Sequence, residues 1–194
     1  METPRFAVVL SGCGVFDGSE IHEAVCALLA IDEAGCAYQC FAPNTWQAKT
    51  VDHFTGEASA IAGDADNRNV LAESARIARG NILDLSEFNP KDFDAIIFPG
   101  GFGAAMNWSN FAVRGPACEV NEEVERALNA SYEAGIVIGA MCIAPTVVAR
   151  VLGKHKVKVT VGNDKAIAAG IAKMGAVHQD CGAAEVCVDE ENKI

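Results

Sequence analysis

The chain has 194 residues, of which 51% are hydrophobic, and it carries a formal net charge of −11. This length and apolar share are enough for one substantial core, so the simplest organisation is a single domain. The charge argues against a nucleic-acid partner, because neutralising phosphates requires basic clusters that this chain lacks. No stretch approaches the ~20 apolar residues that a membrane-spanning helix needs, so we expect no membrane partner.

The start of the sequence, METPRFAVVLSGCG, enters an apolar strand at once, without a basic leader or an Arg- and Ser-rich transit composition. The 8 cysteines do not follow the spacing of a disulfide framework. Free thiols favour a reducing compartment, and we expect a cytoplasmic protein. Cys36 and Cys40 would share one face of a strand, where core packing is favoured over metal binding. No CxxC or HExxH motif occurs, so we predict no metal site.

Short apolar runs alternate with helical patterns, which is typical of a mostly parallel sheet covered by helices on both faces. In chain order, we predict a strand at residues 6–10, a helix at 19–34, a strand at 36–42, a helix at 67–79 capped near Asp66, a strand at 95–98, a helix at 121–134, a strand at 136–141 followed by a helix, a strand at 157–161, a helix at 164–174 and a strand at 185–188. The sequence shows no repeat and no domain boundary.

The segment IVIGAMCIAPTVVARVL, residues 136–152, is the most informative part of the chain. It predicts a buried strand that turns sharply into a helix, with Cys142 at the corner. The partial positive charge of a helix N-terminus stabilises a thiolate, so we expect a lowered pKa for Cys142. This arrangement is the cysteine version of the nucleophile elbow.

Two further segments follow predicted strands and should meet Cys142 at the carboxyl edge of the sheet, where ligands bind in such folds. They are Ser11-Gly12-Cys13-Gly14 and Pro99-Gly100-Gly101-Phe102-Gly103. The backbone N–H groups of Gly101 and Ile143 could form an oxyanion hole above the sulfur. A tight turn without a catalytic role is the alternative for the glycine-rich segment.

The first segment permits two other interpretations, and both are weak. Gly12, Gly14 and Gly18 depart from the GxGxxG spacing, and no acidic residue follows the second strand, so we expect no dinucleotide and no other cofactor. Cys13 is a second candidate thiol without a clear source of activation.

Glu20 and Glu23 lie three residues apart on one face of the first predicted helix. A carboxyl group directed at Cys142 could serve as a general base, so both are candidate catalytic residues. Glu20 also fits a helix-capping pattern, and Glu23 could instead be a solvated helix residue. His22 between them is expected to be exposed.

Several motifs resemble the ElbB-type glyoxalase group of the ThiJ/PfpI superfamily, which has a class I glutamine amidotransferase-like fold. The matching segments are SGCGVFDGSEIHEAV, FAPN, DHFTGEA, NRNVLAESARIARG, FPGGFGAAMNWSNFA, GAMCIAPT and VDEENKI. The resemblance implies a flavodoxin-like three-layer α/β sandwich, Cys142 as nucleophile and a glutamate from the first helix, either Glu20 or Glu23. It also implies a homodimer and conversion of glyoxal and water to glycolate, with an associated deglycase-like activity.

The sequence departs from the superfamily at two places. Relatives often supply a histidine directly after the cysteine or about twenty residues later, where this chain has Ile143 and residues 161–164. We expect His178 to be a surface residue at a strand end. Residues 189–192 resemble a hairpin turn, after which relatives continue with another strand and helix. We therefore expect one amidotransferase-like domain over residues 1–194, and a missing C-terminal strand and helix is the open alternative.

The favoured hypothesis is a cofactor-independent glyoxalase that acts on a small aldehyde or dicarbonyl through a hemithioacetal on Cys142. The alternative is a non-enzymatic redox- or adduct-sensing protein that uses the same thiol, because accessible thiolates oxidise readily. Release of ammonia from glutamine requires the absent histidine and is the least favoured function.

Overall fold

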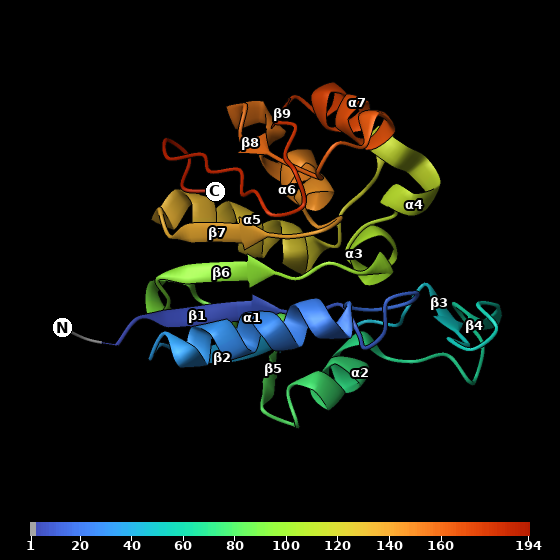
Figure 1. Cartoon of the computed structure of the whole chain (residues 1–194). Coiled ribbons are helices and arrows are strands. Elements are labelled where there is room, and N and C mark those ends of the chain that lie inside the picture. The colour runs from blue at the N-terminus through green and yellow to red at the C-terminus, as the bar shows by residue number, and fades with distance from the viewer. Residues whose placement is uncertain (1–2) are drawn as a thin grey trace.

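The computed structural model describes residues 3–194. Its centre is a five-stranded parallel sheet in the order β5-β2-β1-β6-β7 (Figure 1). These strands are β1 (Arg5–Val9), β2 (Ala37–Ala42), β5 (Ile82–Asp84), β6 (Ala95–Phe98) and β7 (Val137–Ala140). The predicted α/β class with a mostly parallel, flavodoxin-like sheet is confirmed.

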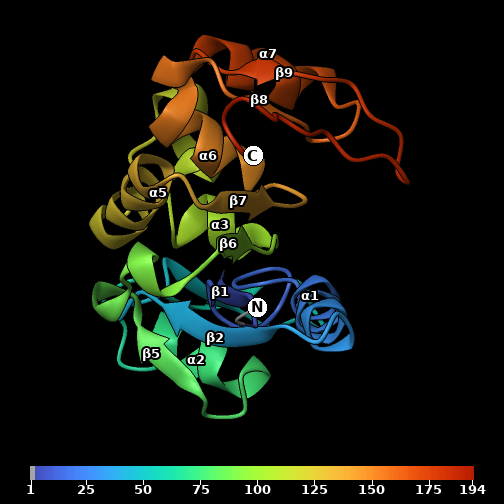
Figure 2. The ribbon, with the colours of Figure 1, turned by 90° about the vertical axis from the view of Figure 1, so that its left-hand side faces the viewer.

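Helices cover both faces of the sheet, as Figure 2 shows when the sheet is viewed from its side. They are α1 (Ile21–Glu33), α2 (Val70–Ile77), α3 (Phe102–Met106), α4 (Phe111–Arg114), α5 (Glu122–Ala134), α6 (Pro145–Leu152) and α7 (Lys165–Lys173). Short 3₁₀ turns occupy Leu85–Glu87, Pro90–Asp92, Gly115–Ala117 and Gly153–His155. No helix of the described chain is long and apolar enough to cross a bilayer.

The alternation of side chains along β1 explains the layers. Ala7 and Val9 join the larger core beneath α5 and α6, whereas Val8 and Leu10 join a second core beneath α1. All four are fully buried, as expected for a central parallel strand with both faces covered. The central strand that leads to the candidate site is therefore packed on both of its faces.

Two small sheets lie outside the central one. The hairpin of β3 (Lys49–Val51) and β4 (Ala58–Ile61) was not predicted, and the parallel pair β8 (Lys158–Val159) and β9 (Val177–His178) forms separately. The predicted strand at 157–161 shrinks to β8, and the predicted strand at 185–188 is irregular. Among the described residues, neither segment forms hydrogen bonds with the central sheet. An apolar run in the sequence indicates burial but does not determine which strand a segment pairs with.

The helix ends follow the expected capping chemistry, with one correction. Asn121 and Asp164 cap α5 and α7 by accepting bonds from backbone N–H groups of the first turn. Helix α2 is shorter than predicted, and its cap is Asn69 rather than Asp66. Sequence alone cannot choose between two acceptor residues three positions apart.

Candidate active site

Cys142 lies at the corner between β7 and α6, and the predicted elbow is confirmed. Its backbone has φ +58°, a left-handed conformation that is costly for a residue with a side chain. The N–H of Ala144 donates to the carbonyl of Met141 at 3.1 Å and closes the turn. Pro145 then begins α6, where its missing N–H costs nothing. Cys142 remains exposed to solvent at this corner.

Gly100 leaves the space in which the sulfur sits. A Cβ atom at this position would lie 2.3 Å from the Cβ and 2.9 Å from the Sγ of Cys142, and 2.7 Å from the Oε2 of Glu23. Any larger residue would therefore push the thiol and the carboxylate apart. In the sequence, the glycine density of residues 99–103 is the only signal for this role of Gly100.

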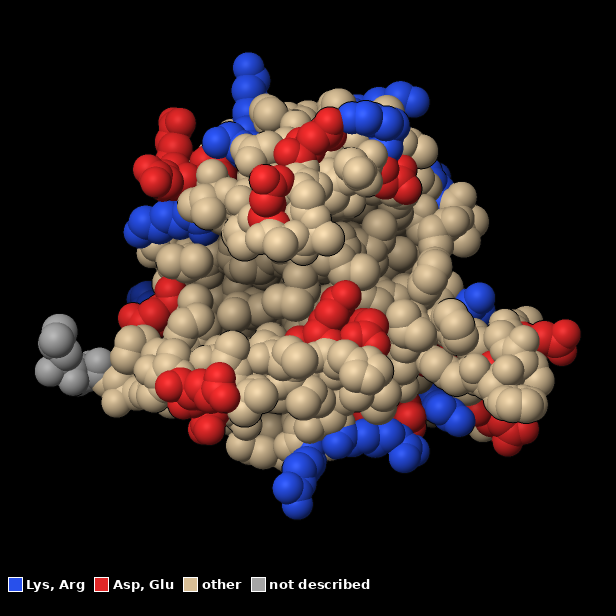
Figure 3. Space-filling view, viewed as in Figure 1, with Lys and Arg blue, Asp and Glu red and all other residues tan. Residues whose placement is uncertain are grey.

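Glu23 is the glutamate that faces the sulfur. Its Oε2 accepts a hydrogen bond from the N–H of Gly100 at 2.8 Å, which fixes the carboxylate beside the elbow. One Cβ atom placed at Gly100 would contact both this Oε2 and the Cys142 Sγ, and the carboxylate raises the pKa of the thiol. The space-filling view shows acidic side chains at the N-terminal end of α1, next to a hollow in this face of the molecule (Figure 3).

Glu20 is occupied elsewhere. One of its carboxylate oxygens accepts from the N–H of Glu23 and the other pairs with Nδ1 of the exposed His22, each at 2.8 Å. Its backbone N–H donates to the carbonyl of Gly100 at 2.9 Å. Glu20 therefore caps α1 and holds the start of that helix against the glycine-rich loop.

The electrostatics of Cys142 differ from the expectation. Although Cys142 is exposed as a residue, its thiol group is partly desolvated, which raises the pKa, and the neighbouring Glu23 carboxylate raises it further. The N–H groups of Gly101 and Ile143 lower it, but they do not outweigh the other two effects. The prediction of a lowered pKa is wrong, because it counted the helix N-terminus and not the adjacent carboxylate.

The predicted oxyanion donors converge on the sulfur. The backbone N–H groups of Gly101 and Ile143 both act on the Cys142 sulfur and lower the pKa of the thiol. Gly101 has φ +101°, and a Cβ atom there would meet the carbonyl oxygen of Gly18 at 2.3 Å, so this orientation requires glycine. Two inward N–H groups at a nucleophile can hold a developing negative charge.

The other candidate residues lie apart from this cluster. His178 is not a surface residue: its side chain is 7% exposed, and its Nε2 accepts from the N–H of Val161 at 3.2 Å. Burial raises the pKa of Cys13, followed by the effect of the Glu73 carboxylate, so this thiol gains no activation. All 8 cysteines are free.

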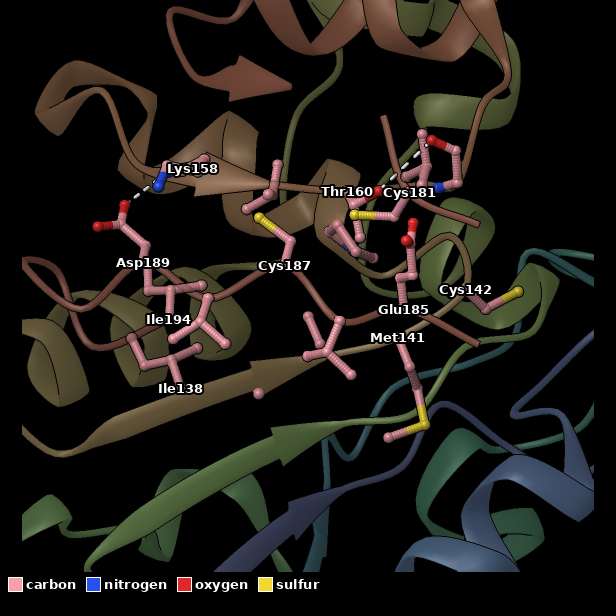
Figure 4. A pocket seen from close by; sticks show the side chains of 18 of the residues that line it. Ile138, Met141, Cys142, Lys158, Thr160, Cys181, Glu185, Cys187, Asp189 and Ile194 are labelled. Atoms are coloured by element: carbon pink, nitrogen blue, oxygen red, sulfur yellow. Dashed lines mark hydrogen bonds between the residues drawn. The ribbon is translucent and has the colours of Figure 1, made fainter. Parts of the chain in front are cut away.

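Two cavities meet at Cys142. The first, about 890 Å³, lies between β7 and residues 181–194. In Figure 4, Cys142 stands at one end of this cavity, and its side chain points away from Cys187 and Ile194. The second cavity, about 650 Å³, is bounded by α3, α4, α7 and the elbow, and we call it the α7 cavity.

Comparison with known proteins gives the family. The human glutamine amidotransferase-like class 1 domain-containing protein 3, mitochondrial, is 47% identical over 98% of this chain and 72% of its own length. The chain belongs to this family of class I glutamine amidotransferase-like proteins. The rat ES1 protein homolog, mitochondrial, is 46% identical over 98% of the chain and 73% of its own length. No protein-family model matches the chain.

Solved structures agree with this assignment. An isoprenoid biosynthesis protein with an amidotransferase-like domain from Ehrlichia chaffeensis superposes with a TM-score of 0.87 at 40% identity, covering 97% of this chain and 85% of that one. A ThiJ/PfpI domain protein from Brachyspira murdochii has the same fold, with a TM-score of 0.56 at 14% identity over 92% of this chain and 80% of that one. The superfamily resemblance is thereby confirmed at the level of the fold.

The cytoplasmic expectation is wrong. The human and rat relatives and the ES1 protein of Danio rerio, which is 37% identical over 98% of this chain and 74% of its own length, are all named as mitochondrial proteins. Free thiols persist in any reducing compartment, so the cysteine pattern could not distinguish the cytosol from the mitochondrion.

Proposed function

We propose that this protein is a cofactor-independent glyoxalase that converts a 2-oxoaldehyde and water into a 2-hydroxy acid through a covalent adduct on Cys142. The observation that carries the proposal is the position of the Glu23 carboxylate, which the N–H of Gly100 holds beside the Cys142 thiol. A thiol with a fixed neighbouring base is the arrangement that nucleophilic catalysis requires.

Attack on the substrate begins with transfer of the thiol proton to Glu23. Because the pKa of Cys142 is raised, the thiol is protonated at neutral pH and needs a base at the moment of attack. The sulfur bonds to the aldehyde carbon, the carbonyl π electrons move to oxygen, and the proton completes a hemithioacetal. The N–H groups of Gly101 and Ile143 are placed to hold that oxygen while it is negative.

The redox change is internal to the substrate. Glu23 removes the proton on the hemithioacetal carbon, and the electron pair forms an enediol with the neighbouring carbonyl carbon. The hydroxyl proton of the first carbon passes to the oxygen of the second carbon, and the abstracted proton returns to the second carbon itself. This leaves an alcohol there and a thioester on Cys142, so one carbon is oxidised and the other reduced. Water cleaves the thioester, releasing the hydroxy acid and restoring the thiol. No external oxidant, reductant or metal enters the balance.

The redox-sensing alternative is supported less well. It depends on a thiolate that forms readily at neutral pH, and both burial and the Glu23 carboxylate favour the protonated thiol. Selective oxidation of Cys142 by mild peroxide, together with negligible turnover of dicarbonyls, would favour the sensor over the enzyme.

The deciding experiment compares formation of glycolate from glyoxal by the wild type, Cys142→Ala and Cys26→Ala. Cys26 is an exposed cysteine on α1 and serves as the matched control. We expect Cys142→Ala to fall to the uncatalysed background and Cys26→Ala to keep full activity. Equal rates in the wild type and Cys142→Ala would end the proposal.

The deglycase-like activity needs a separate measurement. Following the concentrations of free glyoxal and of the glycated adduct separately would show whether the protein removes the adduct directly or only removes free glyoxal.

A further inference from the structure

Glyoxal has only four heavy atoms, and the α7 cavity next to the sulfur measures about 650 Å³. This volume is within the range of pockets that hold drug-sized ligands. We propose, resting on the proposed glyoxalase function, that the preferred substrate is a 2-oxoaldehyde with an apolar aryl or alkyl group, and that this group occupies the α7 cavity.

The position of the reacting oxygen selects this cavity over the larger one. Gly101 and Ile143, whose N–H groups would hold the oxyanion, line the α7 cavity together with Cys142. Neither of them lines the first cavity. The Cys142 side chain also points away from the residues at the far end of that first cavity (Figure 4). A carbonyl bound at these amides would therefore carry its substituent toward α7.

The lining of the α7 cavity fits a hydrocarbon group. Its walls come from Val15, Phe111, Pro116, Ile143 and Ile167, and small residues on α7 keep the space open. The charged lining residues are Asp164 and Lys173 at the two ends of α7. The Asp164 carboxylate already accepts bonds from the N–H groups of Ala166 and Ile167. The middle of the cavity therefore offers apolar contact without competing polar partners.

Burial of hydrocarbon in this space should be visible as selectivity. Each buried methylene group contributes about 4-fold in binding, so an aryl substituent should raise kcat/KM by about 10-fold or more over glyoxal. Because the substituent is bonded to the second reacting carbon, it also changes the intrinsic reactivity of the dicarbonyl. The contribution of the cavity is therefore measured by changing the cavity while the substrate stays the same.

The test measures kcat/KM for glyoxal, methylglyoxal and phenylglyoxal with the wild type, Ala169→Leu and Ala172→Leu. Both alanines are exposed on the same helix, but Ala169 lines the α7 cavity and Ala172 lies outside the lining. Leucine is nearly as favourable in a helix as alanine, so both variants should fold. We expect Ala169→Leu to lower turnover of phenylglyoxal at least 10-fold and turnover of glyoxal less than 2-fold, and Ala172→Leu to change neither. Equal use of all three substrates by the wild type, or equal effects of the two variants, would overturn the proposal.

A second measurement separates this inference from the glyoxalase function itself. The rate of alkylation of Cys142 by N-benzylmaleimide, divided by the rate with N-ethylmaleimide, is measured by mass spectrometry and normalised to a free thiol. A ratio that exceeds that of the free thiol and is lost in Ala169→Leu would support the α7 cavity as an apolar site, even if no dicarbonyl were turned over. A ratio equal to that of the free thiol would overturn it, even if glyoxal were converted.

Discussion

At the scale of single residues, the thiol of Cys142 is held between groups of opposite effect. The N–H groups of Gly101 and Ile143 favour the thiolate, and the Glu23 carboxylate and burial favour the thiol. The balance lies toward the thiol, so the proposed function requires Glu23 to accept its proton. The roles of a base and a nucleophile that share one proton can be distinguished by experiment. Removing the base should speed alkylation of the thiol and slow catalytic turnover.

We predict that Glu23→Gln speeds alkylation of Cys142 by iodoacetamide near neutral pH while it slows glyoxal turnover by ~10²–10⁴-fold, the usual contribution of a general base. Loss of the negative charge lowers the pKa of the thiol, so more thiolate is present at a given pH. In the wild type, the alkylation rate should still be rising above pH 9, since the raised pKa delays ionisation.

Glu20→Gln is the control for this prediction. Its side chain caps α1 through the N–H of Glu23, so a modest loss of stability is expected without faster alkylation. If Cys142 were alkylated at the wild-type rate in both variants, Glu23 would not control the protonation of the thiol.

At the scale of secondary-structure elements, the strongly patterned segments were predictable and the short ones were not. The strand at 95–98 matches β6, and the helix at 121–134 matches α5 within one residue. By contrast, β5, β9, α3, α4 and the β3–β4 hairpin were missed because they are short and depend on contacts with segments distant in the sequence. For example, the N–H of Val51 donates to the carboxylate of Asp17 at 2.8 Å.

Strand β2 provides a test of burial by pH. Cys40 is 1% exposed, and burial raises its pKa from 9.0 to about 11. Below pH 9 the thiol is protonated in both states, so it contributes no pH dependence. Between about pH 9 and 11 the unfolded chain loses this proton and the folded chain keeps it, so the free energy of unfolding falls as pH rises.

We expect this thiol to contribute about 2 kcal/mol to the loss of stability between pH 8 and pH 11. The measurement compares urea denaturation of the wild type and Cys40→Ala at pH 8 and pH 11. The variant should start lower because of the cavity it creates, and should lose less stability over this interval. Equal losses in the two proteins would mean that Cys40 ionises freely in the folded state.

At the scale of the whole molecule, the C-terminal residues are tied to segments far away in the sequence. The N–H of Ile138 in β7 donates to the carbonyl of Lys193 at 2.9 Å, and the hydroxyl of Tyr132 donates to the side chain of Asn192 at 2.8 Å. The predicted turn at 189–192 is confirmed by the paired backbone bonds between Asp189 and Ile194. This turn holds one wall of the first cavity.

We predict that Asp189→Ala lowers the free energy of unfolding by about 1–3 kcal/mol, because it leaves the N–H of Lys158 without its acceptor. Although burial raises the pKa of Asp189, the hydrogen bonds from Lys158 and Asn192 outweigh that effect and hold it below its ordinary value. The contribution is therefore present at neutral pH and is lost as pH falls through the folded pKa.

Hydrogen exchange provides the readout for this variant. Protection should fall at Lys158 and around residues 189–194 and stay unchanged in β1 and β6. Glu190→Ala, at an exposed position of the same turn, should have no effect. Unchanged protection in Asp189→Ala would show that other contacts hold this segment.

The homodimer implied by the family resemblance stays a prediction. Of the two tryptophans, Trp108 is fully buried and its indole N–H donates to the carbonyl of Leu10 at 3.3 Å, whereas Trp46 is 65% exposed. Only Trp46 is therefore available for an interface, and light scattering in solution would measure the assembly directly.

The sequence by itself determined the parallel sheet and the elbow at Cys142, because the periodicity of apolar residues and the position of glycine and proline are local properties. Only the tertiary structure decided between Glu20 and Glu23. Glu23 lies on the first turn of α1 and Glu20 is its cap, and the difference between them arises from the loop after β6. The N–H of Gly100 donates to the Glu23 carboxylate, whereas the carbonyl of Gly100 accepts from the backbone N–H of Glu20. The raised pKa of Cys142 and the α7 cavity depend in the same way on groups distant in sequence, since burial and charge act through space and not along the chain.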